Sequence, residues 1–154
     1  MRNSSLIRKM ALATTAVALL GAQTIASAED EENYEARYRH TVMEAIGYSF
    51  GALALVFTNR VDRPDQLAVH AEALATSASL VETLFPEGSQ GGDALPIIWD
   101  EPEKVAAAAR ETADATAALA EAAKGGDRAA IAKAFKAAGD SCKGCHEQYK
   151  EEDD

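Results

Sequence analysis

The residues with the clearest chemical potential lie near the C-terminus, where Cys142-Lys143-Gly144-Cys145-His146 forms a C-x-x-C-H motif. Two thiols three positions apart on a helix share one face, so both can add to vinyl groups of a single porphyrin. His146 follows Cys142 by four positions and can present its imidazole to the iron of that porphyrin. The motif therefore predicts one covalently attached haem c, with Cys142 and Cys145 as thioether links and His146 as an axial iron ligand.

Two other uses of the cysteines remain as alternatives. A thioredoxin-like dithiol has its cysteines at a helix start beside a strand, whereas these lie near a helix end in a sequence with no predicted strand. A zinc site would need His40 or His70 as a further ligand, and neither has a ligand-like spacing to the cysteines. A disulfide between the two cysteines would close only a very short loop. The sequence context favours haem over zinc or dithiol chemistry.

Residues 1–28 have the features of a secretory signal peptide: a basic start, a mostly apolar stretch over 10–22, and Ala26-Ser27-Ala28 as a cleavage pattern. We expect cleavage there, which leaves 29–154 as a single haem domain. Polar residues interrupt the apolar stretch, so an uncleaved membrane anchor is the less favoured alternative and no stable membrane association is predicted. Thioether attachment takes place beyond the bacterial inner membrane, so we expect a periplasmic location in a Gram-negative bacterium.

The expected mature domain is strongly acidic. The whole chain has 15 basic and 25 acidic residues, and residues 1–28 contain three of the basic ones, so the rest has a formal net charge of −13. Such a surface repels phosphate backbones, which argues against nucleic acid as a partner, while it suits a soluble protein that meets basic partners. No carboxylate pair, nucleophile triad or phosphate-binding loop stands out, so the sequence does not predict an enzyme.

Four segments carry apolar residues at steps of three and four, which is the pattern of amphipathic helices. We expect helices over residues 33–59, 64–85, 101–125 and 127–149, with a long loop containing Trp99 before the third. This pattern predicts an all-α fold, an antiparallel four-helix bundle. The apolar stripes of the third and fourth helices are largely alanine, and a buried planar haem would fill the space that they leave.

With these features the chain resembles the cytochrome c′ family over residues 29–150. The resemblance rests on the attachment motif that follows three helices, on the first-helix residues Tyr38-Arg39-His40, Met43 and Phe50-Gly51, and on the loop from Gly91-Gly92-Asp93 through Pro96 to Trp99. It implies a five-coordinate haem with Met43 on the open distal face, Arg39 near a propionate, and His40 and Asp93 at the haem edge. Many members have glutamine at the position of His40 and arginine at that of Lys150.

The resemblance leaves two functions open. In the first, a high-spin haem binds nitric oxide and carbon monoxide, with a role in nitric oxide tolerance, electron transfer or both. In the alternative, Met43 is a sixth ligand of a low-spin electron carrier, which would raise the reduction potential and block gas binding. The resemblance also implies a redox partner protein and a homodimer formed through the first two helices, whose outward faces are expected to include Tyr34, Val42 and Ala54.

Overall fold

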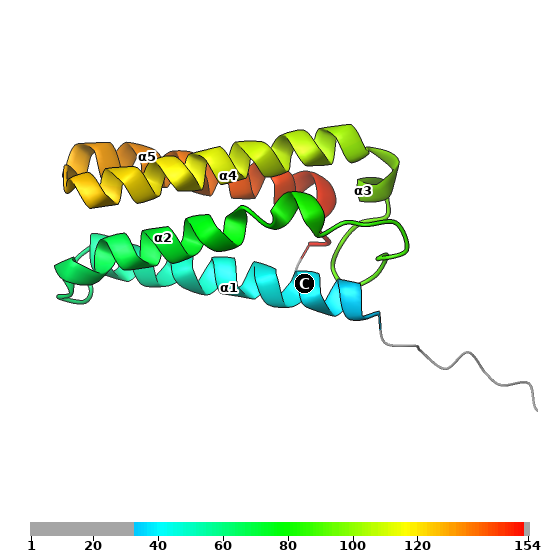
Figure 1. Cartoon of the computed structure of the whole chain (residues 1–154), viewed down its shortest axis with the longest axis horizontal. Coiled ribbons are helices and arrows are strands. Elements are labelled where there is room, and N and C mark those ends of the chain that lie inside the picture. The colour runs from blue at the N-terminus through cyan, green and yellow to red at the C-terminus, as the bar shows by residue number, and fades with distance from the viewer. Residues whose placement is uncertain (1–32, 153–154) are drawn as a thin grey trace, which may run out of the picture.

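The computed structural model describes residues 33–152 (Figure 1). Four long helices form an up-and-down bundle, no strand occurs among these residues, and the predicted all-α four-helix fold is confirmed. The expected signal peptide lies outside the described residues. The helices are α1 (Tyr34–Phe57), η1 (Pro64–Gln66), α2 (Leu67–Ala78), η2 (Val81–Thr83), α3 (Ile97–Asp100), α4 (Pro102–Gly125) and α5 (Arg128–Tyr149), with η marking a 3₁₀ helix.

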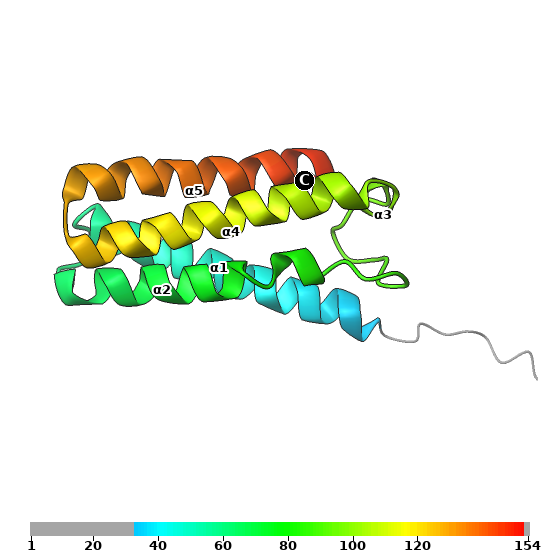
Figure 2. The same cartoon turned by 45° about the horizontal axis from the view of Figure 1, so that its top comes forward.

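The long helices pack mainly on their neighbours in the chain: α1 on α2 and α4 on α5, with α2 against α4 joining the two pairs. Figure 2 shows α4 between α5 and α2. The helices α1 and α5 therefore face each other without close backbone packing along most of their length. The loop between η2 and α4, which includes α3, covers one end of the bundle, where α1 starts and α5 ends (Figure 1).

Local hydrogen bonds set the helix boundaries close to where the sequence predicts them. The side chain of Asn33 accepts a hydrogen bond from the Ala36 amide (3.2 Å) at the start of α1, and Asp127 accepts one from the Ala129 amide (2.8 Å) at the start of α5. Gly126 ends α4 with a φ of 74°, a left-handed conformation that favours glycine.

The second expected helix differs from the prediction because it is broken after residue 78. The Thr76 hydroxyl donates to the carbonyl of Glu72 (2.8 Å), and the Ser79 hydroxyl donates to the carbonyl of Thr76 (2.7 Å). The amide of Leu80 then bonds three residues back, to Ser77, rather than four. Hydroxyl side chains that take up helix carbonyls favour such a break. The chain continues as η2 into the loop at the bundle end.

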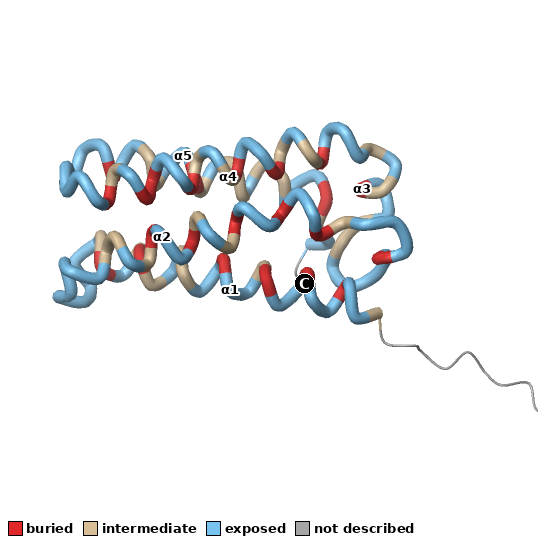
Figure 3. Tube along the Cα trace, viewed as in Figure 1, coloured by how far each residue is buried: buried red, intermediate tan, exposed pale blue. Residues whose placement is uncertain are grey.

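The main core runs along the bundle as a band of buried residues on the facing sides of the helices (Figure 3). Leu53, Leu74, Leu119 and Ile131 supply one large, almost fully buried side chain from each long helix. The remaining core positions of α4 and α5 are mostly alanine, as the sequence indicates. Burial of the four large side chains contributes about 1.5–3 kcal/mol each to stability.

The outward side of α1 also carries exposed aromatic and apolar side chains. By length and composition alone this 24-residue helix could cross a membrane. In the bundle one of its faces packs in the core, while Tyr34 is 69% exposed. The expectation that Val42 faces outward is wrong: Val42 is buried with Arg39 and Ile46, at steps of three and four on the inner face. Ala54 is partly buried.

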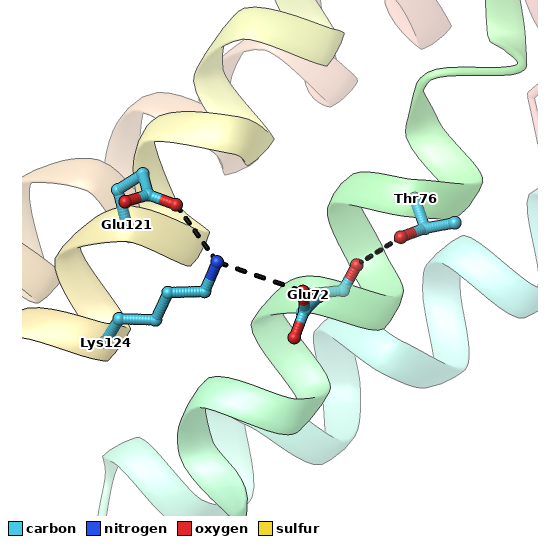
Figure 4. Close-up of polar contacts among 4 residues, drawn as sticks. All are labelled: Glu72, Thr76, Glu121 and Lys124. Atoms are coloured by element: carbon cyan, nitrogen blue, oxygen red, sulfur yellow. Dashed lines mark hydrogen bonds and ion pairs between the residues drawn. The ribbon is translucent and has the colours of Figure 1, made fainter.

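An ion-pair network joins α4 to α2 on the bundle surface. The Lys124 ammonium lies 3.1 Å from a carboxylate oxygen of Glu121 and 3.8 Å from one of Glu72 (Figure 4). These carboxylates raise the pKa of Lys124, the contact with Glu121 contributing most. All three side chains are exposed, so water screens the network and it contributes little to the stability of the bundle.

Candidate haem site

One pocket lies between the first turns of α1, the loop after η2 and the end of α5. Its position follows from the fold, because α1 and α5 face each other there without close backbone packing. The pocket has both apolar walls and ionisable groups. Its lining residues are Ala36, Arg39, His40, Met43, Phe85, Gly92, Asp93, Ala94, Ile98, Cys145, His146, Tyr149 and Lys150.

Of the seven site residues predicted from the sequence, six line this pocket, and Cys142 lies one turn before Cys145 on the same helix. Both cysteines are half-buried free thiols. Burial raises the pKa of each thiol, and for Cys145 the neighbouring Cys142 raises it further. Cys145 also packs against the small apolar cluster of Ile98, Val105 and Tyr149. The two thiols are therefore neutral near pH 7, spaced for a double covalent link on one side of the pocket.

His146 lines the pocket from the last turn of α5, and its ring is exposed. Its backbone carbonyl accepts a hydrogen bond from the Lys150 amide (3.0 Å), which ends the helix. Lys150 lines the pocket as well, and its ammonium donates to the carbonyl of Glu151 (3.2 Å). The end of α5 thus places an imidazole and a cation at the same pocket.

Two of the other predicted residues lie at the pocket rim on separate elements. His40, on α1, is exposed, and its Nε2 lies 3.7 Å from a carboxylate oxygen of Glu44. Asp93 is exposed on the loop, where its carbonyl accepts a hydrogen bond from the amide of Glu151 (2.8 Å). The structure therefore brings together residues that are more than 50 positions apart in the sequence. Their contact with a haem edge stays a prediction.

Met43 and Arg39 come from the inner face of α1, one turn apart. Met43 is partly buried and packs against the main core as well as lining the pocket. Arg39 is 5% exposed, and its guanidinium donates to backbone carbonyls of residues 84–91. The resemblance implies a propionate contact for Arg39; the structure shows that much of its hydrogen-bonding capacity is used within the chain.

Tyr149, the last residue of α5, also lines the pocket, although the sequence does not single it out as a site residue. Its hydroxyl donates to one carboxylate oxygen of Glu101 (2.9 Å), and the other accepts from the Lys104 ammonium (2.6 Å). The hydrogen bond from Lys104, and then that from Tyr149, lowers the pKa of Glu101, while burial raises the pKa of Tyr149. The contact joins the end of α5 to the start of α4 beside the pocket.

Phe85 and Ile98 were also missed as pocket walls. Phe85 and Tyr149 are the last residues of the expected helices 64–85 and 127–149. An apolar residue that continues the helical pattern beyond the close-packed core is the signal for a residue of the pocket wall. Ile98 lies in the loop, where no periodic pattern exists. No stripe or motif in the sequence places it at the pocket.

The pocket and its side chains fit a covalently bound haem. Two thiols, an imidazole and a thioether side chain lie at or beside one space with apolar walls, and the cations Arg39 and Lys150 suit the carboxylates of a porphyrin. Among residues 33–152, no group of three His, Cys, Asp or Glu side chains is placed to bind a metal ion. The zinc alternative therefore has no ligand set in this part of the chain.

A bundle of four helices with C-x-x-C-H on its last helix, facing a methionine-lined pocket, defines a four-helix c-type haem protein. The chain belongs to the cytochrome c′ family, whose model, described as Cytochrome C', matches residues 34–150. Members of this family carry covalently bound haem c, so the predicted cofactor is confirmed.

Two relatives show the extent of the similarity. Cytochrome c′ of Rhodospirillum rubrum is 34% identical over 145 residues, which cover 92% of this chain and 98% of that protein. Cytochrome c′ of Pararhodospirillum photometricum is 37% identical over 117 residues, 74% of this chain and 94% of that protein.

Among solved structures, a ferrous variant of cytochrome c prime from Alcaligenes xylosoxidans with bound NO matches with a TM-score of 0.73 and 28% identity. The match covers 81% of this chain and 100% of that one.

Proposed function

We propose that this chain is a periplasmic haem protein with a high-spin, five-coordinate iron that binds nitric oxide and carbon monoxide. Its role would be nitric oxide binding or tolerance, electron transfer or both, without substrate turnover. The observation that carries the proposal is that His146 and Met43, from different helices, line the same pocket. When bound there, haem supplies an iron that can take up a small gas and exchange one electron.

The residues of the chain divide the binding task. Cys142 and Cys145 would hold the cofactor through thioether bonds to its two vinyl groups, and His146 would supply a nitrogen ligand to its iron. Arg39, His40 and Asp93 are the proposed haem-edge residues. The side chain of Met43 is apolar and uncharged, so it excludes water from its side of the pocket.

The apolar pocket walls favour the proposed gases over dioxygen. Ala36, Met43, Phe85 and Ile98 have no side-chain hydrogen-bond donor, and bound dioxygen is stabilised by such donors. Structures of cytochrome c prime from Alcaligenes xylosoxidans with bound NO and with bound carbon monoxide, 28% and 27% identical to this chain, also support gas binding.

Absorption and electron spin resonance spectra of the purified protein, ferric and ferrous, with and without carbon monoxide, test this proposal. We expect high-spin signals and a large spectral shift on addition of the gas. A low-spin ferric signal with a methionine–iron charge-transfer band and no response to the gas would instead make Met43 the sixth ligand. Met43→Ala is the matched variant: it should leave the high-spin spectrum in place if Met43 only covers the site.

We also propose a homodimer through the outward face of α1. Tyr34, Tyr38, Tyr48 and Leu55 are 69%, 51%, 72% and 51% exposed, and their numbers fall on one series of alternating steps of four and three. That spacing places them along one side of a helix, where a second helix can pack. A second copy of the chain is the proposed occupant because the same stripe on both copies makes a self-complementary, two-fold interface.

Sedimentation of the haem-loaded protein tests the dimer. We expect Tyr48→Glu with Leu55→Glu to convert a dimer to a monomer, because charges would be buried without partners in the interface. Ala117→Glu, on the exposed side of α4, is the control and should leave the dimer intact. A monomeric wild-type protein at concentrations near 100 μM would contradict the proposal.

Export and a redox partner complete the proposed function. We expect the mature chain to begin at Glu29 and to be recovered from the periplasmic fraction, which N-terminal sequencing of the purified protein checks. A chain that keeps residues 1–28 and sediments with membranes would contradict cleavage. The acidic composition suits a redox partner protein with a basic surface.

A further inference from the structure

Arg39 is a buried cation whose hydrogen bonds converge on one segment of the chain. Its Nη1 donates to the carbonyls of Leu84 (3.2 Å) and Ser89 (3.0 Å) and to the Ser89 hydroxyl (3.3 Å). Its Nη2 donates to the carbonyl of Gly91 (2.6 Å). Burial lowers the pKa of Arg39, and Glu35 partly opposes this. A planar guanidinium can reach acceptors on several residues at once, so this side chain fixes the segment from residue 84 to 91 relative to α1.

Aromatic rings and a serine complete this arrangement. The guanidinium carbon lies 5.3 Å from the centre of the Phe85 ring and 5.4 Å from that of Trp99. The indole of Trp99 donates to the carbonyl of Pro86 (3.1 Å) and to the hydroxyl of Ser89 (3.3 Å). Ser89 is fully buried, and its hydroxyl donates to the Pro86 carbonyl (2.7 Å). We call Arg39, Ser89 and Trp99 the loop clamp.

The segment that the loop clamp holds continues directly into the pocket wall. Phe85 lines the pocket at its start, and residues 92–94 line it immediately after Gly91. Just beyond them the backbone pairs with the end of α5, since the Leu95 amide donates to the Tyr149 carbonyl (2.9 Å). This wall is therefore fixed at one end by α1, through the clamp, and at the other by α5.

We propose that Arg39 is a positioning residue that sets the place of residues 84–94 and thereby the access of gas to the pocket. This effect on gas access passes through Ser89 and Trp99, and it does not require the haem-edge contact proposed above for Arg39. The gas-access part rests on the proposed function, whereas the clamp itself does not. Because the clamp residues touch one another, substitutions in two of them should have non-additive effects.

A double-mutant cycle with Arg39→Lys and Ser89→Ala in the haem-loaded protein tests this proposal. Lysine keeps the positive charge and loses the planar fork, while alanine removes the hydroxyl between Arg39 and Trp99. We expect each single variant to raise the carbon monoxide association rate constant at least about twofold, and the double variant to raise it no further. Arg110→Lys, the same change at an exposed position of α4, is the control and should not change this rate constant.

The reduction potential distinguishes this positioning role from a role in which Arg39 acts directly on the haem. If Ser89→Ala leaves both the gas rate and the potential unchanged while Arg39→Lys shifts the potential, Arg39 acts directly on the cofactor and the proposal is wrong. Additive effects of the two substitutions would overturn it as well. If the Arg39→Lys variant does not bind haem, the double-mutant cycle is made with Ser89→Ala and Trp99→Phe instead.

Hydrogen exchange keeps the clamp testable if the protein does not bind gas. We expect faster amide exchange over residues 84–95 in Arg39→Lys and in Ser89→Ala, with exchange over 128–138 unchanged. A six-coordinate protein that shows this pattern would contradict the proposed gas binding and leave the clamp intact. Unchanged exchange over 84–95 would contradict the clamp, whatever the iron binds.

Discussion

Side chains of the protein close one end of the bundle, whereas the other end surrounds a pocket. At the closed end, which we define as residues 50–58 and 128–138 with the parts of α2 and α4 beside them, the Phe57 and Phe135 rings stack 5.9 Å apart. The Arg128 guanidinium lies 4.9 Å from the Phe57 ring centre and donates to the Phe57 carbonyl (2.9 Å). Buried leucine and isoleucine side chains fill the interior below them.

At the pocket end, which comprises residues 34–46, 84–105 and 142–151, polar contacts replace much of the apolar packing. Apart from residues that belong to the main core, the apolar cluster there has Ile98, Val105 and Tyr149 as its buried members. The loop clamp and the backbone pairing of Ala94 with Lys150 connect the elements instead. Side chains of the protein therefore fill the core of the closed end, whereas the interior of the pocket end depends on haem to be filled.

A pair of rings marks the boundary between the two ends. Phe50 from α1 and Phe135 from α5 stack with ring centres 4.4 Å apart, and Gly139 lies against Phe50. Large rings between two helices keep their backbones apart. This stack is the layer of the closed end that lies nearest the pocket.

Removal of the haem attachment should have the largest effect on the difference between the two ends. In Cys142→Ala with Cys145→Ala we expect no covalent haem, and a loss of about 4 kcal/mol or more of unfolding free energy, as for any tightly held ligand. Hydrogen exchange should become fast over 84–100 and 142–150 and stay slow over 128–138, because the closed end does not need the cofactor. Equal loss of protection at both ends would contradict the division, and Cys142→Ala alone, which keeps one thioether, is the control.

A cavity at the closed end should have a smaller effect, confined to stability. Leu119 is fully buried, so Leu119→Ala is expected to lower the unfolding free energy by about 2–5 kcal/mol. The haem absorption spectrum and the carbon monoxide affinity should not change, since Leu119 does not line the pocket. Denaturant unfolding followed by circular dichroism measures the loss. Val61→Ala, at a 41% exposed position, should change stability by no more than about 0.5 kcal/mol.

The closed end was the part that the sequence predicted best. Phe50, Leu53 and Phe57 of α1 follow one another at steps of three and four, as do Ile131 and Phe135 of α5. Because such residues meet another helix at the closed end, periodicity alone identifies the core there. The cap at Asp127 likewise follows from local chemistry. Val42, at the pocket end, shows the limit of this reasoning, since a position beside the main stripe faces inward where Arg39 and Ile46 are both buried.

The pocket end was predicted through its motif and the family resemblance rather than through periodicity. The motif gave the haem and its three attachment residues, and the resemblance gave Met43. The hydrogen bonds of Arg39 to Ser89 and Gly91 were out of reach, because they join positions about 50 apart through a loop with no repeating pattern. Tertiary contacts of irregular segments leave no such signal in a single sequence.

Gly139→Ala, at the boundary between the two ends, should increase the stability of the protein slightly. Glycine inside a helix costs about 0.5–1 kcal/mol relative to alanine, and the added methyl group would lie 3.5 Å from Phe50 Cζ, an ordinary contact. We expect a rise in the unfolding free energy of that size with an unchanged haem spectrum. In the control, Gly47→Ala, the methyl group meets nothing within 4 Å, so a difference between the two variants isolates the ring contact. A loss of stability in Gly139→Ala alone would mean that the ring stack cannot adjust.

The smallest expected effect concerns acid pH and the contact between Glu101 and Tyr149 at the pocket end. The hydrogen bond from Lys104, and then that from Tyr149, holds the pKa of Glu101 below its ordinary value. A carboxyl group with a lowered pKa in the folded state stabilises the fold fully above its ordinary pKa, and this contribution is lost as pH falls through the lowered value. The thermal midpoint of the wild type should therefore fall more between about pH 6 and pH 3 than that of Glu101→Gln. Glu111→Gln, the same change at an exposed position within α4, should keep the acid dependence of the wild type. Equal slopes for Glu101→Gln and wild type would show that this contact does not contribute to the acid sensitivity of the pocket end.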